Sequence, residues 1–96
     1  MPRDKRAVVG ALLRKGFRLR EGDHAFFTFH TADGRRTAVF TKVSHSHKVI
    51  PKALVARMGR QCKLSTGEFH ALVDCSLSGA GYEALLRERG YLPKSP

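Results

Sequence analysis

The chain has 96 residues, of which 42% are hydrophobic, and this length supports one small domain with little room for a large internal cavity. No uninterrupted apolar stretch approaches the roughly 18 to 20 residues that a membrane-spanning helix needs, so we expect no membrane partner. Its 18 lysines and arginines against eight acidic residues give a net charge of +10, which favours a polyanion as the partner.

The positive charge is concentrated in the first two thirds of the chain. Residues 1–63 hold 15 basic and four acidic side chains, a net charge of +11, whereas residues 64–96 hold three basic and four acidic ones, a net charge of −1. Since each neutralised phosphate releases counterions, residues 1–63 are expected to bind a nucleic acid. A basic surface that serves only solubility is the plain alternative.

The N-terminal segment predicts a helix followed directly by a strand. Asp4 is suited to cap a helix over about residues 5–15, and Gly16 stands where a left-handed residue commonly ends a helix. Residues 17–20 then alternate apolar and basic side chains, the pattern of a half-buried strand.

Two further strands are predicted in the middle of the chain, over about residues 24–31 and 36–43. Asp33-Gly34 between them is a strong signal for a two-residue hairpin turn. Alternation along the first of these strands places three residues on one face, namely Ala25, Phe27 and Phe29. It places four on the other, namely His24, Phe26, Thr28 and His30. The strands are therefore expected to form a three-stranded antiparallel sheet.

Three helices are predicted in the second half of the chain. Their approximate ranges are 51–62, 65–74 and 78–90. Ser65 and Glu68 have the spacing of a capping box at the start of the second of them, and Gly90 is placed to end the third. We expect residues 91–96 to be a fraying tail.

This order of elements predicts an α+β fold. Helix, three antiparallel strands and helix is the α-β-β-β-α topology of the double-stranded-RNA-binding domain (dsRBD), in which the helices cover one face of the sheet. We assign residues 1–63 to this dsRBD-like core. Residues 64–96 are expected to form a C-terminal extension of two short helices, packed as part of the same domain.

The N-terminal sequence and the small number of cysteines both indicate the same cellular compartment. The charged N-terminus leads into an apolar run that is short and lacks a small-residue cleavage site, so we expect no signal peptide and a cytoplasmic location. Cys62 and Cys75 are too few for a disulfide framework, and both are expected to be core thiols. The His45-Ser46-His47 pair lacks a second ligand pair, so no metal or other cofactor is expected.

His24 is the strongest catalytic candidate, because it begins an aromatic strand inside the basic part of the chain. RNA is cleaved through its own 2′-hydroxyl when a base takes that proton and cations stabilise the phosphorane, without a metal ion. Histidine is the side chain that titrates near neutral pH. We predict that His24 is this general base. A hydrogen-bonded, inert strand histidine is the alternative.

Other candidates are assigned with their alternatives. Arg35, Arg36 and Lys48 are candidates for phosphate contacts, although a charged hairpin tip is as often merely solvated. His45 either anchors its loop, serves as a general acid or does neither. Phe26 either stacks on a base or belongs to the core.

His30 and His70 are expected to be ordinary surface or half-buried residues. Neither stands in a pattern of the kind that singles out His24. We therefore expect no catalytic role for either of them.

A series of short motifs runs from the first helix to the loop after the third strand. They are Phe17-x-Leu19 after a glycine-stopped helix, Gly22-x-His24, the aromatic strand, Asp33-Gly34-Arg35-Arg36 and His45-x-x-Lys48. In this order and spacing they resemble the HicA family of small toxins, the ribonuclease partners of HicB antitoxins. Residues 64–75 are similar to the extension of a longer subgroup in that family.

The resemblance implies a dsRBD-like fold, metal-independent cleavage of mRNA, growth inhibition when unopposed, and neutralisation by a HicB-like acidic antitoxin. The catalytic histidine of the family falls on His24. The chain departs from the family pattern at Asp23, where serine is common, and at His47, where the loop is usually rich in glycine.

Two other functions stay open at this point. A non-catalytic module would hold RNA or DNA through the basic surface and recognise its shape. An interaction protein would use the basic face for an acidic partner alone, and would not bind RNA at physiological salt.

Overall fold

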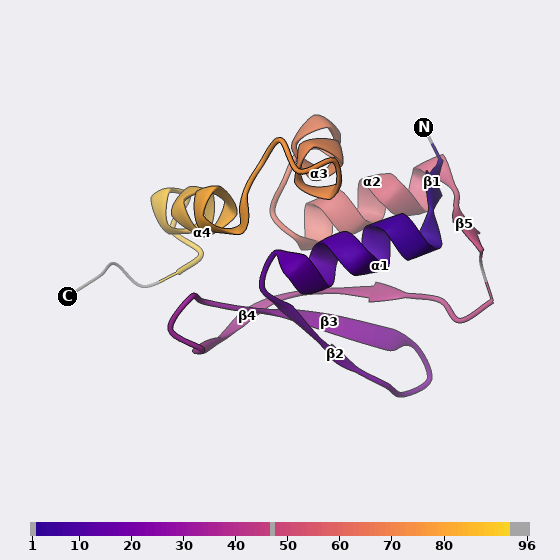
Figure 1. The fold of residues 1–96 in the computed structure, drawn as a ribbon, viewed down its shortest axis with the longest axis horizontal. Coiled ribbons are helices and arrows are strands. Elements are labelled where there is room, and N and C mark those ends of the chain that lie inside the picture. Colours follow the sequence, from indigo (N-terminus) through magenta and orange to yellow (C-terminus); the bar gives the residue numbers. More distant parts are fainter. Residues whose placement is uncertain (1, 47, 93–96) are drawn as a thin grey trace.

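The chain folds into helices packed on one face of a three-stranded antiparallel sheet, which confirms the predicted α+β class (Figure 1). The computed structural model describes residues 2–46 and 48–92. The sheet consists of β2 (Phe17–Arg20), β3 (Ala25–His30) and β4 (Arg36–Val43). The helices of the described part are α1 (Lys5–Arg14), α2 (Lys52–Gln61), α3 (Thr66–Val73) and α4 (Gly79–Glu88).

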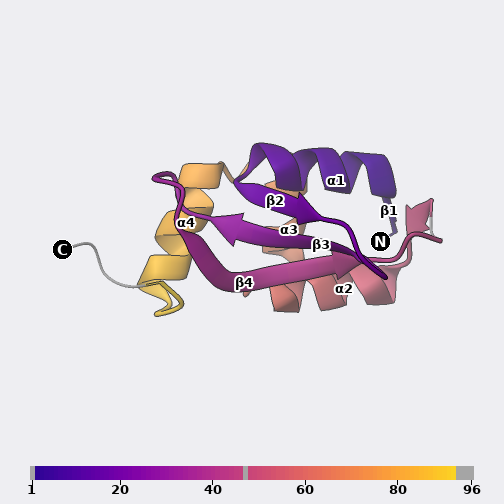
Figure 2. The same cartoon turned by 90° about the horizontal axis from the view of Figure 1, so that it is seen from below.

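One face of the sheet is covered and the other is open. In Figure 1 the helices α1, α2 and α3 lie above the sheet, and α4 lies beside its end. Figure 2 looks onto the opposite face, which no helix of the described residues covers. None of the helices in this part of the chain has the length and apolar character needed to cross a membrane.

Alternation along β3 separates the two faces as predicted. Ala25, Phe27 and Phe29 are buried beneath the helices, whereas Phe26 and His30 are only half-buried. β3 pairs with β2 on one side and β4 on the other, so its buried side chains lie at the centre of the core.

Gly16 explains how the chain turns from α1 directly into β2. Its φ of +105° lies in the left-handed region, and a Cβ atom there would come within 2.8 Å of the Phe29 ring. The Gly16 carbonyl accepts a hydrogen bond of 2.8 Å from the His30 N–H. Only glycine permits this close approach of helix end and strand. At the other end of α1, the Asp4 side chain accepts from the Ala7 N–H, as a helix cap should.

The prediction of a two-residue turn at Asp33-Gly34 is wrong. The Thr31 N–H donates to the Arg35 carbonyl at 2.9 Å, so the loop holds the three residues between them. A two-residue type I′ turn needs positive φ at both central residues, but of Asp33 and Gly34 only the glycine has one, +86°. A three-residue loop with a left-handed glycine at its end satisfies the chain instead.

A second pairing was not predicted. β1 (Arg3–Asp4) and β5 (Val49–Ile50) form an antiparallel pair at the end of the molecule, beside the start of α1. Strands of two residues have no alternation to detect, so their pairing depends on tertiary contacts alone. It holds the start of the chain against the segment that leads into α2.

The two C-terminal helices share the core of the sheet. Phe69 of α3 and Tyr82 of α4 are fully buried in the same hydrophobic cluster as Phe29. The Tyr82 ring lies 4.9 Å from the Phe29 ring and 5.7 Å from the Phe17 ring, between centroids. Its hydroxyl donates to the Cys62 carbonyl at 2.8 Å, and burial raises the pKa of Tyr82 well above its ordinary value.

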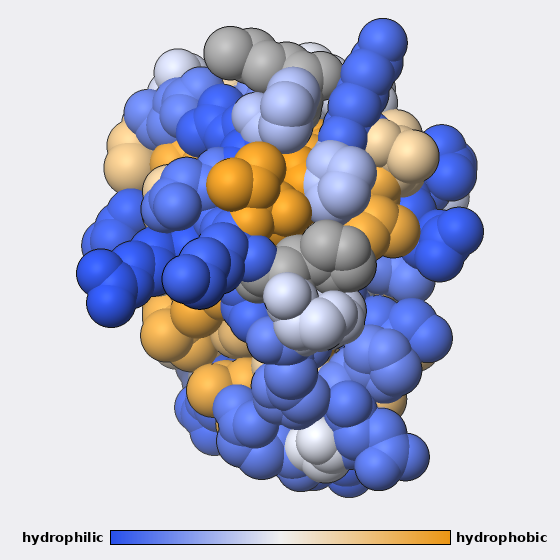
Figure 3. Space-filling view, turned by 90° about the vertical axis from the view of Figure 1, so that its right-hand side faces the viewer, coloured by the Kyte–Doolittle hydropathy of each residue, from blue (hydrophilic) through white to orange (hydrophobic). Residues whose placement is uncertain are grey.

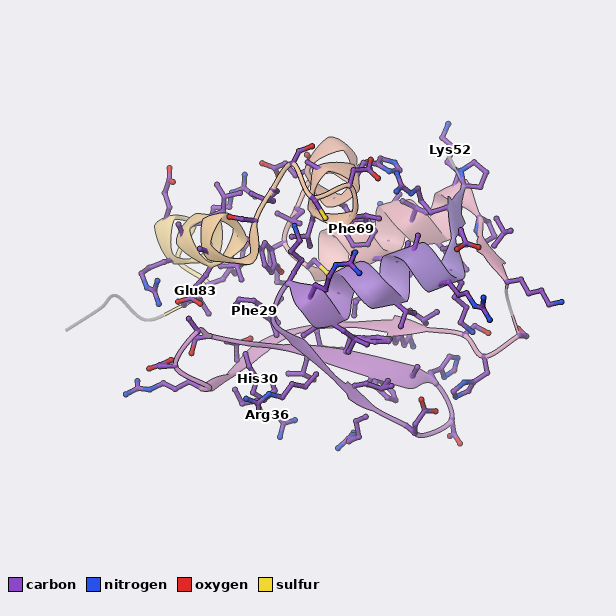
Figure 4. All side chains as sticks on the ribbon, viewed as in Figure 1. Phe29, His30, Arg36, Lys52, Phe69 and Glu83 are labelled. Atoms are coloured by element: carbon purple, nitrogen blue, oxygen red, sulfur yellow. The ribbon has the colours of Figure 1, made fainter. Side chains whose placement is uncertain are left out.

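Polar contacts also fasten α4 to the rest of the domain. The Lys15 ammonium, which is buried, donates to the Leu77 carbonyl at 2.6 Å. The Glu83 carboxylate accepts from the Ala32 N–H at 2.8 Å, so α4 holds the loop between β3 and β4 (Figure 4). Both contacts join the extension to elements of the first 63 residues.

Two smaller expectations need correction. Cys62 is buried, and desolvation raises the pKa of its thiol to about 12, but Cys75 is exposed. Cys75 has a φ of +68° immediately after the end of α3, where the chain turns outward. Within the expected tail, Leu92 is buried, and the Tyr91 N–H bonds to the Leu86 carbonyl; residues 93–96 lie outside the described residues.

Glu68 links the start of α3 to the end of α4, and this link gives a pH-dependent prediction. The predicted capping box with Ser65 is present, and the Arg89 guanidinium donates to both carboxylate oxygens at 3.0 and 2.5 Å. These hydrogen bonds, that from Arg89 first, lower the pKa of Glu68 from its ordinary value of 4.5 to about 2. A lowered pKa stabilises the fold above pH 4.5, and this contribution disappears as the pH falls through 2.

We therefore expect Glu68→Gln, which keeps the capping geometry, to lower the melting temperature at pH 7 by about 4 °C, because a partly exposed ion pair contributes up to about 1 kcal/mol. The difference should shrink between pH 4.5 and about 2 in thermal melts of both proteins. A difference that stays constant down to pH 2 would contradict this role of the ion pair.

Candidate active site and nucleic-acid interface

His24 lies just before β3, at the end of the sheet where the loop from β2 enters. Its half-buried side chain lines a small pocket of about 90 Å³ between the end of β4 and α2. The ring meets that of Phe26 edge-on, with centroids 6.5 Å apart. Among the described residues it has no hydrogen-bond or ion-pair partner. Its ring nitrogens are therefore not engaged by the fold.

Two cations line the same pocket. Lys42 comes from β4 and Arg57 from α2, and both are exposed. Neither forms an ion pair or hydrogen bond with a described residue. The pocket therefore combines an unengaged imidazole with two positive charges, a set that suits a phosphate group. Figure 3 shows the end of the molecule that carries β1 and β5, where hydrophilic side chains surround small hydrophobic patches.

The three predicted phosphate contacts are not brought together. Arg35 is at the tip of the β3–β4 loop, 3.6 Å from the Asp33 carboxylate and largely exposed. Lys48 lies beside the start of α1, where its carbonyl accepts from the Lys5 N–H at 3.0 Å. Arg36 lies opposite His30 on the open face of the sheet (Figure 4). None of the three lines the His24 pocket.

His45 joins two loops. Its Nε2 lies 3.1 Å from the Gly22 carbonyl and 3.7 Å from the Glu21 carboxylate, so it connects the β4–β5 loop to the β2–β3 loop. This bonding favours the anchoring interpretation over that of a general acid. Asp23 is exposed and has no hydrogen bond to His24 or to any other described residue.

The open face of the sheet gathers a second set of residues, most of which sequence reasoning missed. We call it the outer face, and its residues are Arg18, Arg20, Phe26, Thr28, His30, Arg36, Phe40 and Lys42. The strand register brings them together, because it sets Arg20 opposite Phe26 and Phe26 opposite Lys42. Alternation within each strand was visible in the sequence. Aligning the alternation patterns of the three strands across the two hairpins would have shown that these residues share one face.

The remaining histidines have structural partners. His30 Nδ1 lies 3.0 Å from the Thr28 carbonyl, and His70 Nδ1 lies 3.2 Å from the Arg3 guanidinium. Residues 2–46 and 48–92 contain no group of three or more His, Cys, Asp or Glu side chains placed to hold a metal ion. His47, the other member of the His45-Ser46-His47 pair, lies outside the described residues.

Comparison with known proteins finds no family model, no curated protein and no solved structure that matches the chain.

Proposed function

We propose that the chain is a metal-independent endoribonuclease that cleaves mRNA in the cytoplasm, with His24 as the general base and a HicA-like, dsRBD-like fold. The observation that supports this function is the His24 pocket, where an imidazole without a partner stands beside Lys42 and Arg57. A histidine that served only the fold would be expected to have a hydrogen-bond partner, as His30 and His70 do.

The chemistry follows from these groups. His24 takes the proton of a ribose 2′-hydroxyl, and the 2′-oxygen forms a bond to the adjacent phosphorus. Lys42 and Arg57 neutralise the charge that develops on the phosphorane. The bond to the 5′-oxygen then breaks, and this oxygen takes a proton from a water molecule, while the hydroxide that remains takes back the proton held by His24. The products are a 2′,3′-cyclic phosphate and a 5′-hydroxyl.

We further propose that the protein is the toxin of a toxin–antitoxin pair. An acidic, HicB-like antitoxin would be attracted by the net charge of +11 on residues 1–63, and long-range attraction of this kind speeds association. Covering the His24 pocket would be sufficient to stop cleavage. Co-purification with an acidic protein encoded next to this gene tests the pairing. If no such gene lies beside this one and no partner co-purifies, the pairing is overturned.

A non-catalytic RNA- or DNA-binding module is the second candidate. The observation that favours it is the outer face, where exposed cations and aromatic rings lie together and the proposed general base, His24, is not among them. Such a protein would bind nucleic acid and leave it intact.

Incubation of the purified protein with end-labelled mRNA in excess EDTA distinguishes the two candidates. The nuclease is expected to give fragments with 2′,3′-cyclic phosphate and 5′-hydroxyl ends, and to leave the same sequence intact when it is made of 2′-deoxynucleotides. If the protein binds the mRNA but cleaves it neither in EDTA nor in a second buffer that contains Mg²⁺, the result would support the non-catalytic module. Cleavage only when Mg²⁺ is present would contradict the proposed mechanism.

A further inference from the structure

We propose that the outer face of the sheet binds single-stranded RNA, with bases stacked on Phe26 and Phe40 and phosphates held by the arginines and the lysine around them. This inference rests on the proposed function, because it takes RNA as the ligand. It adds the class of RNA and the residues that recognise it.

The two aromatic rings form a platform. Phe40 of β4 is 46% exposed, although phenylalanine normally contributes to stability by burial. Thr28 pairs with Phe40 and Phe26 pairs with Lys42, so the two rings are diagonal neighbours on one face. Their centroids are 6.5 Å apart and their planes are inclined by 47°. Rings presented in this way offer flat apolar surfaces on which nucleic-acid bases stack.

The platform is surrounded by positive charge. Arg20 lies over the Phe26 ring, with its guanidinium carbon 5.7 Å from the centroid. An open hollow of about 480 Å³ lies over the two rings, and Arg18, Arg20 and Arg36 line it. The outer face contains no acidic residue, and its arginines and Lys42 form no ion pair with a described residue. These cations lack an anion within the protein, and phosphates supply one.

The arrangement favours a single strand over a duplex. In a duplex the flat faces of the bases are hidden in the stack, so they are not accessible to Phe26 and Phe40. A single strand exposes them and carries phosphates on both sides of the platform. The Phe26 ring also touches the edge of His24, so a strand lying across the rings leads to the pocket that holds the proposed base.

Fluorescence anisotropy with a labelled 2′-O-methyl oligonucleotide tests this inference, because that probe lacks the 2′-hydroxyl and is not cleaved. Phe40→Ala and Phe26→Leu are each expected to weaken binding of the single strand by about 5- to 100-fold. Binding of the same probe annealed into a duplex should change little. Arg36→Gln should reduce the slope of log affinity against log salt by about 0.7.

The chain provides matched controls. Tyr91 is also exposed, at 49%, with Lys63 Nζ 5.2 Å from its ring centroid, but it follows α4 and is not part of the sheet. Tyr91→Leu should leave binding unchanged, as should Lys63→Gln, because neither residue lines the hollow over the two rings. Thermal melts verify that each variant folds. Because Phe40 is exposed, its replacement is well tolerated by the core even if Phe26→Leu is not.

Equal binding of the single strand by wild type, Phe40→Ala and Phe26→Leu would overturn the platform, as would a wild type that binds only the duplex. Failure to bind either probe at physiological salt would also overturn it, and would leave an acidic protein as the occupant of this face. These outcomes are independent of cleavage. If the rings are needed for binding but mRNA stays intact in EDTA, the nuclease proposal fails and the platform stands.

Discussion

Replacing His24 with glutamine is expected to lower the rate of RNA cleavage by about 10²- to 10⁴-fold, the usual contribution of a general base. Glutamine has a similar size and polarity but does not take a proton near neutral pH. His24 is half-buried and has no hydrogen-bond partner among the described residues, so its replacement removes no hydrogen bond from the fold. Single-turnover cleavage of a labelled RNA measures the effect.

Retained folding and binding are required for this result to identify a catalytic group. The melting temperature and the affinity for an uncleavable oligonucleotide should both match those of the wild type. His70→Gln is the matched control, because His70 lies on α3, bonds to Arg3, and lines neither the pocket nor the hollow of the outer face. Its cleavage rate should remain within a few-fold of wild type. Unchanged cleavage by the His24 variant would remove it as the base.

Replacing Tyr82 with alanine is expected to have the largest effect on stability, about 3 to 5 kcal/mol. The substitution leaves a cavity beside the Phe17 and Phe29 rings and removes the donor to the Cys62 carbonyl. For a domain of this size such a loss lowers the melting temperature by at least about 12 °C. Thermal or urea denaturation followed by circular dichroism measures it.

Two milder variants separate the contribution of the buried Tyr82 ring from that of its hydroxyl and from that of an exposed tyrosine. Tyr82→Phe keeps the ring and removes only the hydroxyl, so a loss of about 1 to 2 kcal/mol is expected from the unpaired carbonyl. Tyr91→Ala should change stability by less than about 0.5 kcal/mol, since Tyr91 is half exposed. If Tyr82→Ala melted within a few degrees of wild type, α4 would not be part of the cooperative core.

The sequence predicted the elements with clear periodicity and failed where tertiary contacts decide. The buried positions of β3 follow from strict alternation, and the ends of α1 and α3 follow from capping residues, so these predictions are confirmed. The β1–β5 pair has no periodicity, and the length of the β3–β4 loop depends on the φ of Asp33. Leu92 was assigned to a tail because nothing local shows that the core reaches it.

The candidate site was predicted only in part for a related reason. His24 was selected by its neighbours in the sequence, but Lys42 and Arg57 reach its pocket from segments that no local motif connects to it. Arg35, Arg36 and Lys48 are predicted as phosphate contacts from the sequence, but the fold separates them. Cations gather in space according to strand register and helix packing, which a single pass along the sequence does not give.

The burial of Tyr82 also determines when during synthesis the hydrophobic core can be completed. The ribosome makes the sheet and the His24 pocket first, yet the ring that fills the space beside Phe17 and Phe29 belongs to α4. A nascent chain that stops before residue 82 therefore has an incomplete core, although every residue of the proposed active site has been made. In the proposed nuclease, this order would delay a stable active site until α4 has been made.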